Sequence, residues 1–252
     1  MKRYFGFILP IVLAACVQTP AGSDGRQAQQ TQKRASAHTE LGSAYYGAGQ
    51  YDIALQELKE ALAADPDYVP ALNQIALVHL ALGQTRDAQT KFERALRLEP
   101  NNPSVNNNYG MLLCQQGNEK EAMRYFNNAL ADPLYKTPEL AYINAGVCAR
   151  MKGDDAQAEQ YLTKALAMMP DQPQALYNLA EVAYRKGNLQ KARSLITRQL
   201  QVSIPSADSL WLAARIESRL GDQTALSSYG AQLNRRFPNA PQTRAFNEGR
   251  FQ

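Results

Sequence analysis

The chain has 252 residues, 45% of them apolar and 20% charged, so it carries enough apolar side chains for a continuous core. This composition excludes an intrinsically disordered chain. The formal net charge is +4, and removal of Lys2 and Arg3 would lower it to +2. Because no basic block remains in the rest of the sequence, we expect no nucleic-acid partner.

The first residues are typical of an exported protein. Two basic residues precede an apolar run that ends at Leu13 and is too short to span a bilayer core of about 30 Å. The tetrapeptide Leu13–Cys16 resembles a bacterial lipobox, in which the cysteine is acylated and the peptide is cut before it. We predict a lipoprotein signal peptide at 1–15 and lipid attachment at Cys16; the alternative is a plain secretory signal with an incidental cysteine. Among lipoproteins, Val17 in place of aspartate favours the periplasmic face of the outer membrane in a Gram-negative bacterium.

The segment 16–34 is rich in Gln, Thr, Gly and Ser and has no helical period of apolar residues. We interpret it as a lipidated N-terminus followed by a flexible tether, with an r.m.s. reach of about 23 Å. Its last part, 27–34, contains no helix breaker, so an extension of the first helix into this part is the alternative.

From about residue 35 the sequence repeats itself with a step of 34 residues, except for one step of 36 that adds two residues at about 134–139. These spacings resemble the tetratricopeptide repeat (TPR), which implies an all-α solenoid of about six helix-turn-helix repeats in a right-handed superhelix. We expect a TPR domain at 35–238 and a C-terminal tail at 239–252, and the alternatives for this tail are a final helical turn or a loosely trailing segment. The expected repeats lie near 35–68, 69–102, 103–138, 139–172, 173–206 and 207–240.

Each recurring position has a physical role in a pair of antiparallel helices. A small residue such as Gly110 in the first helix allows close approach to the second, and a glycine such as Gly117 ends the first helix at positive φ. Prolines such as Pro100 follow the second helix, which they cannot continue. The sixth repeat departs from the pattern because Gly230 stands where a bulky residue is expected, as in a capping repeat.

The sequence does not indicate an enzyme. It contains only two histidines, and His79 takes the position that Tyr45 and Leu113 occupy in other repeats, which favours packing over catalysis. It has no CxxC pair, HExxH motif or glycine-rich phosphate loop. We therefore expect protein partners and neither a cofactor, a metal nor a small-molecule substrate.

Two cysteines remain after Cys16. Cys114 and Cys148 fall late in the first helices of the third and fourth repeats, and such helices pack side by side in successive repeats. An exported protein meets an oxidising compartment, so we predict a disulfide between them. Two small core residues that never form a bond are the alternative.

The first helices of a TPR solenoid line a groove in which partners bind. Helical periodicity assigns a largely apolar stripe to this groove, and we predict that it holds an apolar or amphipathic peptide segment. Packing between neighbouring helices is the alternative role for each of these side chains. The predicted groove residues are Leu77, Leu80, Met111, Ile143, Val147, Met151, Tyr177 and Tyr184.

The whole chain resembles the PilF/PilW family of type IV pilus biogenesis lipoproteins. The resemblance is carried by the lipobox, the short tether, the six repeats and the segments Asn106–Gly117 and Asn144–Cys148. It implies a pilotin, an outer-membrane lipoprotein that binds pilus secretin subunits and promotes their insertion and assembly. A periplasmic adaptor that docks cell-wall hydrolases, or another envelope assembly machine, is the alternative.

Overall fold

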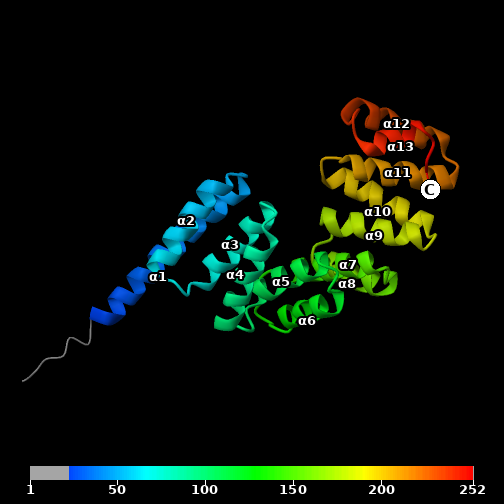
Figure 1. Ribbon diagram of the computed structural model, residues 1–252. Coiled ribbons are helices and arrows are strands. Elements are labelled where there is room, and N and C mark those ends of the chain that lie inside the picture. The colour runs from blue at the N-terminus through cyan, green and yellow to red at the C-terminus, as the bar shows by residue number, and fades with distance from the viewer. Residues whose placement is uncertain (1–22, 252) are drawn as a thin grey trace, which may run out of the picture.

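The computed structural model describes residues 23–251, which form thirteen α-helices and no β-strand (Figure 1). The expected all-α solenoid is thereby confirmed. The predicted signal peptide and Cys16 lie outside the described residues. The helices are α1 (Ser23–Gly47), α2 (Tyr51–Ala64), α3 (Val69–Ala81), α4 (Thr85–Leu98), α5 (Pro103–Gln115), α6 (Glu119–Leu130), α7 (Pro138–Lys152), α8 (Asp155–Met168), α9 (Pro173–Arg185), α10 (Leu189–Val202), α11 (Ala207–Leu220), α12 (Gln223–Arg236) and α13 (Pro241–Asn247).

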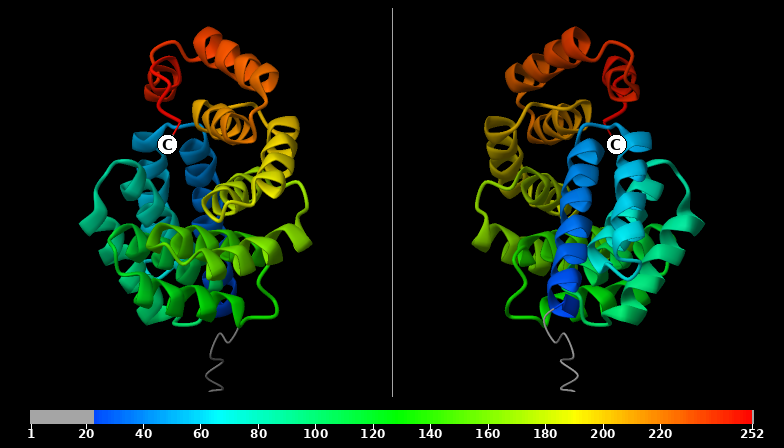
Figure 2. Two further views of the ribbon diagram at one scale, coloured as in Figure 1. Left: turned by 90° about the vertical axis from the view of Figure 1, so that its right-hand side faces the viewer. Right: turned by 90° about the vertical axis from the view of Figure 1, so that its left-hand side faces the viewer.

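The helices form two layers that follow a curved path (Figures 1 and 2). Each odd-numbered helix from α1 to α11 pairs with the next even-numbered helix and also contacts the next odd-numbered one. Within residues 23–251, the backbones of the even-numbered helices do not come close to one another, and only side chains such as Lys191 of α10 and Glu159 of α8 connect them. Because helices on the shorter arc of a curved stack lie closer together, the odd-numbered helices form the concave layer.

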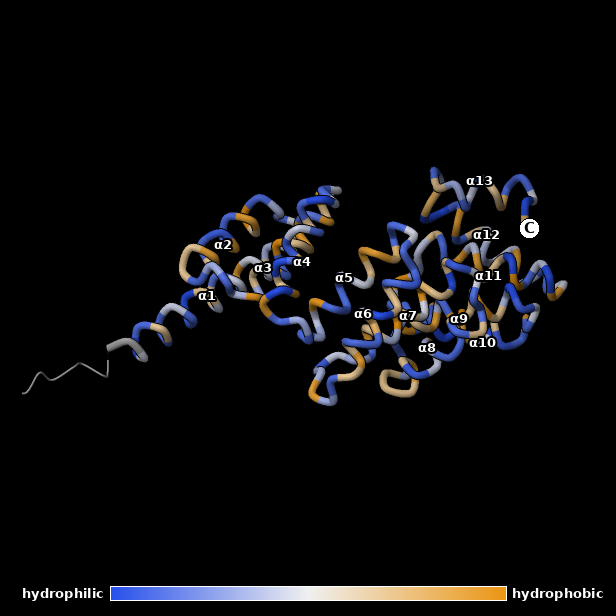
Figure 3. The backbone as a smooth tube through the Cα atoms, turned by 60° about the horizontal axis from the view of Figure 1, so that its bottom comes forward, coloured by the Kyte–Doolittle hydropathy of each residue, from blue (hydrophilic) through white to orange (hydrophobic). Residues whose placement is uncertain are grey.

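Small residues at the helix crossings explain how the two layers pack. A Cβ atom added to Gly110 of α5 would lie 2.9 Å from the ring of Phe126 on α6, and one added to Gly146 would lie 2.7 Å from the Leu162 side chain on α8. Phe126 and Leu162 are fully buried. Apolar and polar stretches alternate along the chain, as expected for helices that bury one side (Figure 3).

Glycines and prolines mark the helix ends as predicted. Gly117 follows α5 with a φ of 81°, in the left-handed region where a side chain would be strained. Pro100 follows the end of α4 at Leu98 by two residues. The helix pairs after the first begin at Val69, Pro103, Pro138, Pro173 and Ala207, each within one residue of the expected start of a repeat.

The alternative of an extended first helix is confirmed over residues 27–34, and the predicted tether is also wrong over residues 23–26, because α1 already begins at Ser23. Its first turns are exposed, so they lack the apolar period that marks a buried helix face. Gln, Ala, Arg and Lys are good helix formers and support the extension without burial. Arg34 near the middle of α1 forms an ion pair with Glu60 of α2 at 3.2 Å.

Of the two alternatives for the C-terminal tail, the added helical turn is confirmed and the loosely trailing segment is wrong, because residues 241–247 form α13. This helix contacts α11 and α12, as the first helix of a seventh repeat would. A Cβ atom added to Gly230 of α12 would lie 2.0 Å from the ring of Phe246. Phe246 thus fills the space that Gly230 leaves in the degenerate sixth repeat, and α13 caps the solenoid.

Candidate protein-binding surface

The inner face of each odd-numbered helix lies opposite the small residue that faces its partner helix. In α5, Gly110 faces α6, and Asn108 lies on the other side because two residues turn an α-helix by about 200°. Asn108 and Met111 are half-buried and Gln115 is exposed. These side chains therefore belong to the concave surface of the third repeat.

Five of the predicted groove residues keep solvent exposure. Leu77, Leu80 and Met111 are half-buried and pack on the edge of the largest core cluster. Tyr177 of α9 is also half-buried, and Met151 of α7 is 53% exposed. These five residues remain candidates for contact with a partner.

Three predicted groove residues are instead buried, which corrects the assignment. Ile143 is 1% exposed and shares a core cluster with Leu179 of the next odd-numbered helix, and Val147 packs in the same cluster. Tyr184 is 5% exposed and packs with Ile216 of α11. These positions point toward the following repeat, which covers them.

A chain of side-chain amides crosses three odd-numbered helices, and sequence periodicity did not predict it. Asn144 of α7 donates to Asn107 of α5 at 3.0 Å, and Asn107 donates to its neighbour Asn108 at 3.2 Å. Asn108 in turn donates to Asn73 of α3 at 3.1 Å. Asn108 and Asn144 occupy the same position of successive repeats, where Gln74 and Asn178 also carry amides outside the chain, and this recurrence is the sequence signal that could have indicated it.

Charged and aromatic side chains gather at the C-terminal end of the same layer. The guanidinium groups of Arg215 and Arg219 lie 4.5 and 4.9 Å from the ring centre of Tyr184. Phe251 stacks on Trp211 with ring centres 5.6 Å apart. Burial, and then the nearby Glu181 carboxylate, raise the pKa of the Tyr177 phenol, so this hydroxyl stays protonated at neutral pH. The surface thus changes from amide and apolar groups in the middle repeats to cationic groups at the end.

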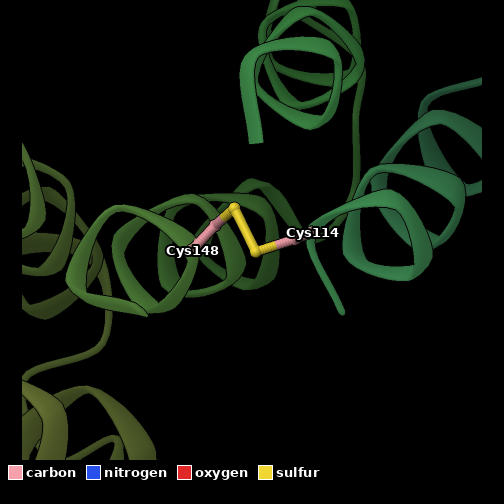
Figure 4. Close-up of a disulfide and its surroundings, with 2 residues drawn as sticks. All are labelled: Cys114 and Cys148. Carbon is pink, nitrogen blue, oxygen red and sulfur yellow. A yellow bond between two sulfur atoms is a disulfide. The ribbon is translucent and has the colours of Figure 1, made fainter. Parts of the chain in front are cut away.

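A disulfide joins the first helices of the third and fourth repeats (Figure 4). It links Cys114 of α5 and Cys148 of α7, whose Cα atoms are 5.8 Å apart. Both cysteines are buried, and they lie on α5 and α7, which also carry Asn107, Asn108 and Asn144. The bond therefore fixes α5 against α7. In the part of the chain that the structure covers, no helix is long and apolar enough to cross a membrane.

The stacked helix pairs and their concave layer define a TPR scaffold. Models of the tetratricopeptide repeat match residues 42–83, 73–136 and 149–202. Repeats of this kind bind proteins through their exposed surfaces, and the chain shares that architecture from α1 to α12.

Whole-chain comparisons identify the family. The type IV pilus assembly protein PilF of Pseudomonas aeruginosa is 29% identical over 245 residues, which cover 95% of each chain. The crystal structure of PilW, a widely conserved type IV pilus biogenesis factor, is 34% identical with a TM-score of 0.77 and covers 84% of this chain and 97% of its own. The structure of Pseudomonas aeruginosa PilF is 27% identical with a TM-score of 0.78 and covers 87% and 99%. The chain belongs to this family of TPR proteins of type IV pilus biogenesis.

Proposed function

We propose that the chain is a pilotin, a lipid-anchored scaffold that binds pilus secretin subunits and promotes their insertion and multimerisation in the outer membrane. Membership in the PilF/PilW family supports a role in pilus biogenesis. The observation that carries the proposal of a binding role is the half-exposed concave surface of α3, α5 and α7. There, apolar and amide side chains lie side by side on three helices that a disulfide and hydrogen bonds hold together.

Binding rather than catalysis is the function that this surface supports best. Its residues in the middle repeats are Leu, Met and Asn, which suit contact with a polypeptide but supply no nucleophile or general base. The guanidinium groups of Arg215 and Arg219 at its C-terminal end both lie over the ring of Tyr184, and their N–H groups suit contact with carboxylates of a partner.

The proposed site of action is the periplasmic face of the outer membrane, and it depends on the lipobox. A triacylated Cys16 would anchor the chain, since each buried CH₂ group contributes about 0.8 kcal/mol. We expect the Cys16→Ser variant to leave the membrane fraction and to reduce secretin assembly. Normal sorting of this variant would contradict the proposed anchor.

Affinity purification from outer membranes tests the proposed partner. The tagged chain should retain secretin subunits as the main partner. A variant with Leu140→Glu and Met151→Glu, which alters exposed concave residues of α7, should retain less. Asn128→Glu, on the exposed face of α6, is the matched control and should leave retention unchanged. Recovery of peptidoglycan hydrolases in place of secretin would contradict the proposal.

A further inference from the structure

Large apolar side chains are exposed unevenly over the solenoid. Among residues 23–251, eleven Leu, Ile, Val and Met side chains are at least 38% exposed. Because the two helices of a repeat are antiparallel, each even-numbered helix ends on the edge of the solenoid where its odd-numbered partner began. We call this edge the start edge, since α1 also begins there. Six of the eleven exposed side chains lie on it, at the last residue of an even-numbered helix or in the loop that follows: Leu98, Leu134, Met168, Met169, Val202 and Ile204.

The loop from α6 to α7 is longer than its counterparts and projects one of these side chains. It spans residues 131–137, whereas four residues follow each of the other even-numbered helices, such as 99–102 after α4. Tyr135 anchors the loop because it is buried in a core cluster, but Leu134 is 85% exposed. The Leu134 N–H donates to the Asp132 carboxylate at 2.8 Å, which fixes the turn. The longer loop thus presents an apolar side chain to solvent in a defined position.

The first turn of α1 and the loop from α6 to α7 lie at the same end of the molecule. Both are at the lower end in Figures 1 and 2, whereas α11 to α13 lie at the upper end. Leu98 is the last residue of α4, in the repeat before this loop, and is 40% exposed. The start edge of the second and third repeats thus presents Leu98 and Leu134 at the end of the molecule where α1 begins.

The proposed anchor would hold this end of the molecule close to a membrane. Six residues, 17–22, separate Cys16 from Ser23. A chain spans at most about 3.6 Å per residue, so the start of α1 would lie within about 25 Å of an acylated Cys16. A phospholipid surface is therefore the nearest extended apolar partner for the two leucines.

The residues beside the two leucines suit the headgroup layer of a bilayer. Arg97 and Lys136 are exposed, so their cationic groups would meet lipid phosphates while the neighbouring apolar side chains reach the boundary of the acyl chains. The acidic residues of the two loops, Glu99 and Asp132, already accept hydrogen bonds from N–H groups of their own loops. The cations are thus the charged groups left for the lipid.

We propose that the start edge of the second and third repeats docks on the phospholipid surface, with Leu98 and Leu134 at the boundary between headgroups and acyl chains. The proposal rests on the proposed function, since Cys16 is the anchor that brings this edge to the lipid. Two leucines give only weak binding by themselves, but a short tether raises the effective concentration of the surface they meet. The contact fixes how the solenoid is oriented on the membrane, with α11 to α13 directed away from it.

Fluorescence quenching by brominated phospholipids is the first test. The acylated full-length chain would be reconstituted into vesicles of phosphatidylethanolamine and phosphatidylglycerol, with Trp211→Phe removing the only tryptophan. In this background, Leu134→Trp should lose about half of its fluorescence to lipids that are brominated near the headgroup. Ile204→Trp is the matched control, because Ile204 is 86% exposed in the loop from α10 to α11, and its fluorescence should stay unchanged. Quenching of both variants, or of neither, would overturn the inference.

Hydroxyl-radical footprinting needs no substitution at the edge and keeps the test decisive if a variant folds poorly. The oxidation rates of Leu98 and Leu134 should fall about fivefold when the acylated chain sits in the same vesicles, compared with the unacylated Cys16→Ser chain in solution. Ile53 and Leu82 lie on the opposite edge and are 41% and 38% exposed, so they are the matched controls. Their rates should be equal in the two samples. Equal rates at Leu98 and Leu134 as well would show that this edge does not touch lipid.

The outcomes separate this inference from the proposed function. If the acylated chain floats with the vesicles but neither leucine senses lipid, the docking edge is wrong while the anchor and the pilotin role stand. If the wild-type chain is not acylated at Cys16 and does not float with vesicles, the proposed anchor is wrong and the inference falls with it.

Discussion

The ring of Phe246 on α13 occupies the space directly above Gly230 on α12, where any Cβ atom would come within 2.0 Å of it. The sixth repeat lacks the bulky residue that the other repeats supply from their own second helix, such as Phe92 and Phe126. A residue from outside the repeat therefore completes the last core layer, and α13 covers the end of the solenoid.

This arrangement predicts a compensating pair of changes. Removal of residues 241–252 should lower the free energy of unfolding by about 2–4 kcal/mol, because it uncovers the core of the sixth repeat. Gly230→Leu should destabilise the full chain through overpacking against Phe246 but partly restore the truncated one. Urea unfolding of the four proteins measures the effect. If the truncation and Gly230→Leu lower the free energy of unfolding additively when combined, Phe246 does not fill this position.

The disulfide should make the middle of the solenoid sensitive to reduction. Because Cys114 and Cys148 are 34 residues apart, the bond should contribute about 3–4 kcal/mol to the free energy of unfolding. A reductant should therefore lower the melting temperature of the wild type and leave that of a Cys114→Ser, Cys148→Ser double variant unchanged. Labelling of both thiols in unreduced, unfolded protein from the periplasm would contradict the predicted bond.

Two substitutions on α7 should distinguish a core position from a surface position of this helix. Ile143→Glu buries a charge at a site that is 1% exposed, so it should unfold the fourth repeat. Met151→Glu, at a site that is 53% exposed, should change stability by less than about 0.5 kcal/mol and weaken secretin binding. Circular dichroism melts and binding assays on both variants provide the measurement. Early melting of Met151→Glu would place this side chain in the core and remove it from the proposed surface.

The sequence predicted the repeat frame well because its signals are local. Glycines such as Gly117 and close-packing positions such as Gly110 follow directly from helix geometry, so the helix pairs after the first begin within one residue of the expected repeats. Residues 23–26 of α1 were not predicted as helix, and 27–34 only as an alternative, because an exposed helix carries no apolar period.

The concave surface was harder to predict than the frame. Helical periodicity identifies the side of a helix that faces its partner, but the side that the next repeat covers depends on the angle between repeats. Ile143 and Tyr184 were therefore assigned to the groove although α9 and α11 bury them. Phe246 fills the space next to Gly230 but lies beyond the last repeat, so the repeat pattern could not predict this contact.

The junction between the fourth and fifth repeats should respond to acid. Hydrogen bonds from Lys186 and Lys191 lower the pKa of the Glu159 carboxyl below its usual value of 4.5. Because this pKa is lower in the folded state, the ion pairs stabilise the fold above about pH 4.5 and lose their effect as the pH falls through the folded-state value. Glu159→Gln should therefore lower the urea midpoint at pH 7 and converge with the wild type near pH 3.

The control for this pH dependence is Glu121→Gln. Glu121 is exposed on α6 and makes no ion pair within residues 23–251. Its substitution should leave the urea midpoint nearly unchanged at both pH values. An equal, pH-independent decrease of the urea midpoint in both variants would contradict a specific role of the Glu159 carboxylate.

Secretin assembly in cells tests the account most directly. The measurement is the fraction of secretin subunits found as multimers in outer-membrane extracts of cells that lack this chain, compared with cells that carry the wild type or the Leu140→Glu, Met151→Glu variant. We predict that multimers are strongly reduced without the chain, restored by the wild type and only partly restored by the variant. Normal multimer abundance in the outer membranes of cells without the chain would contradict the proposed pilotin function.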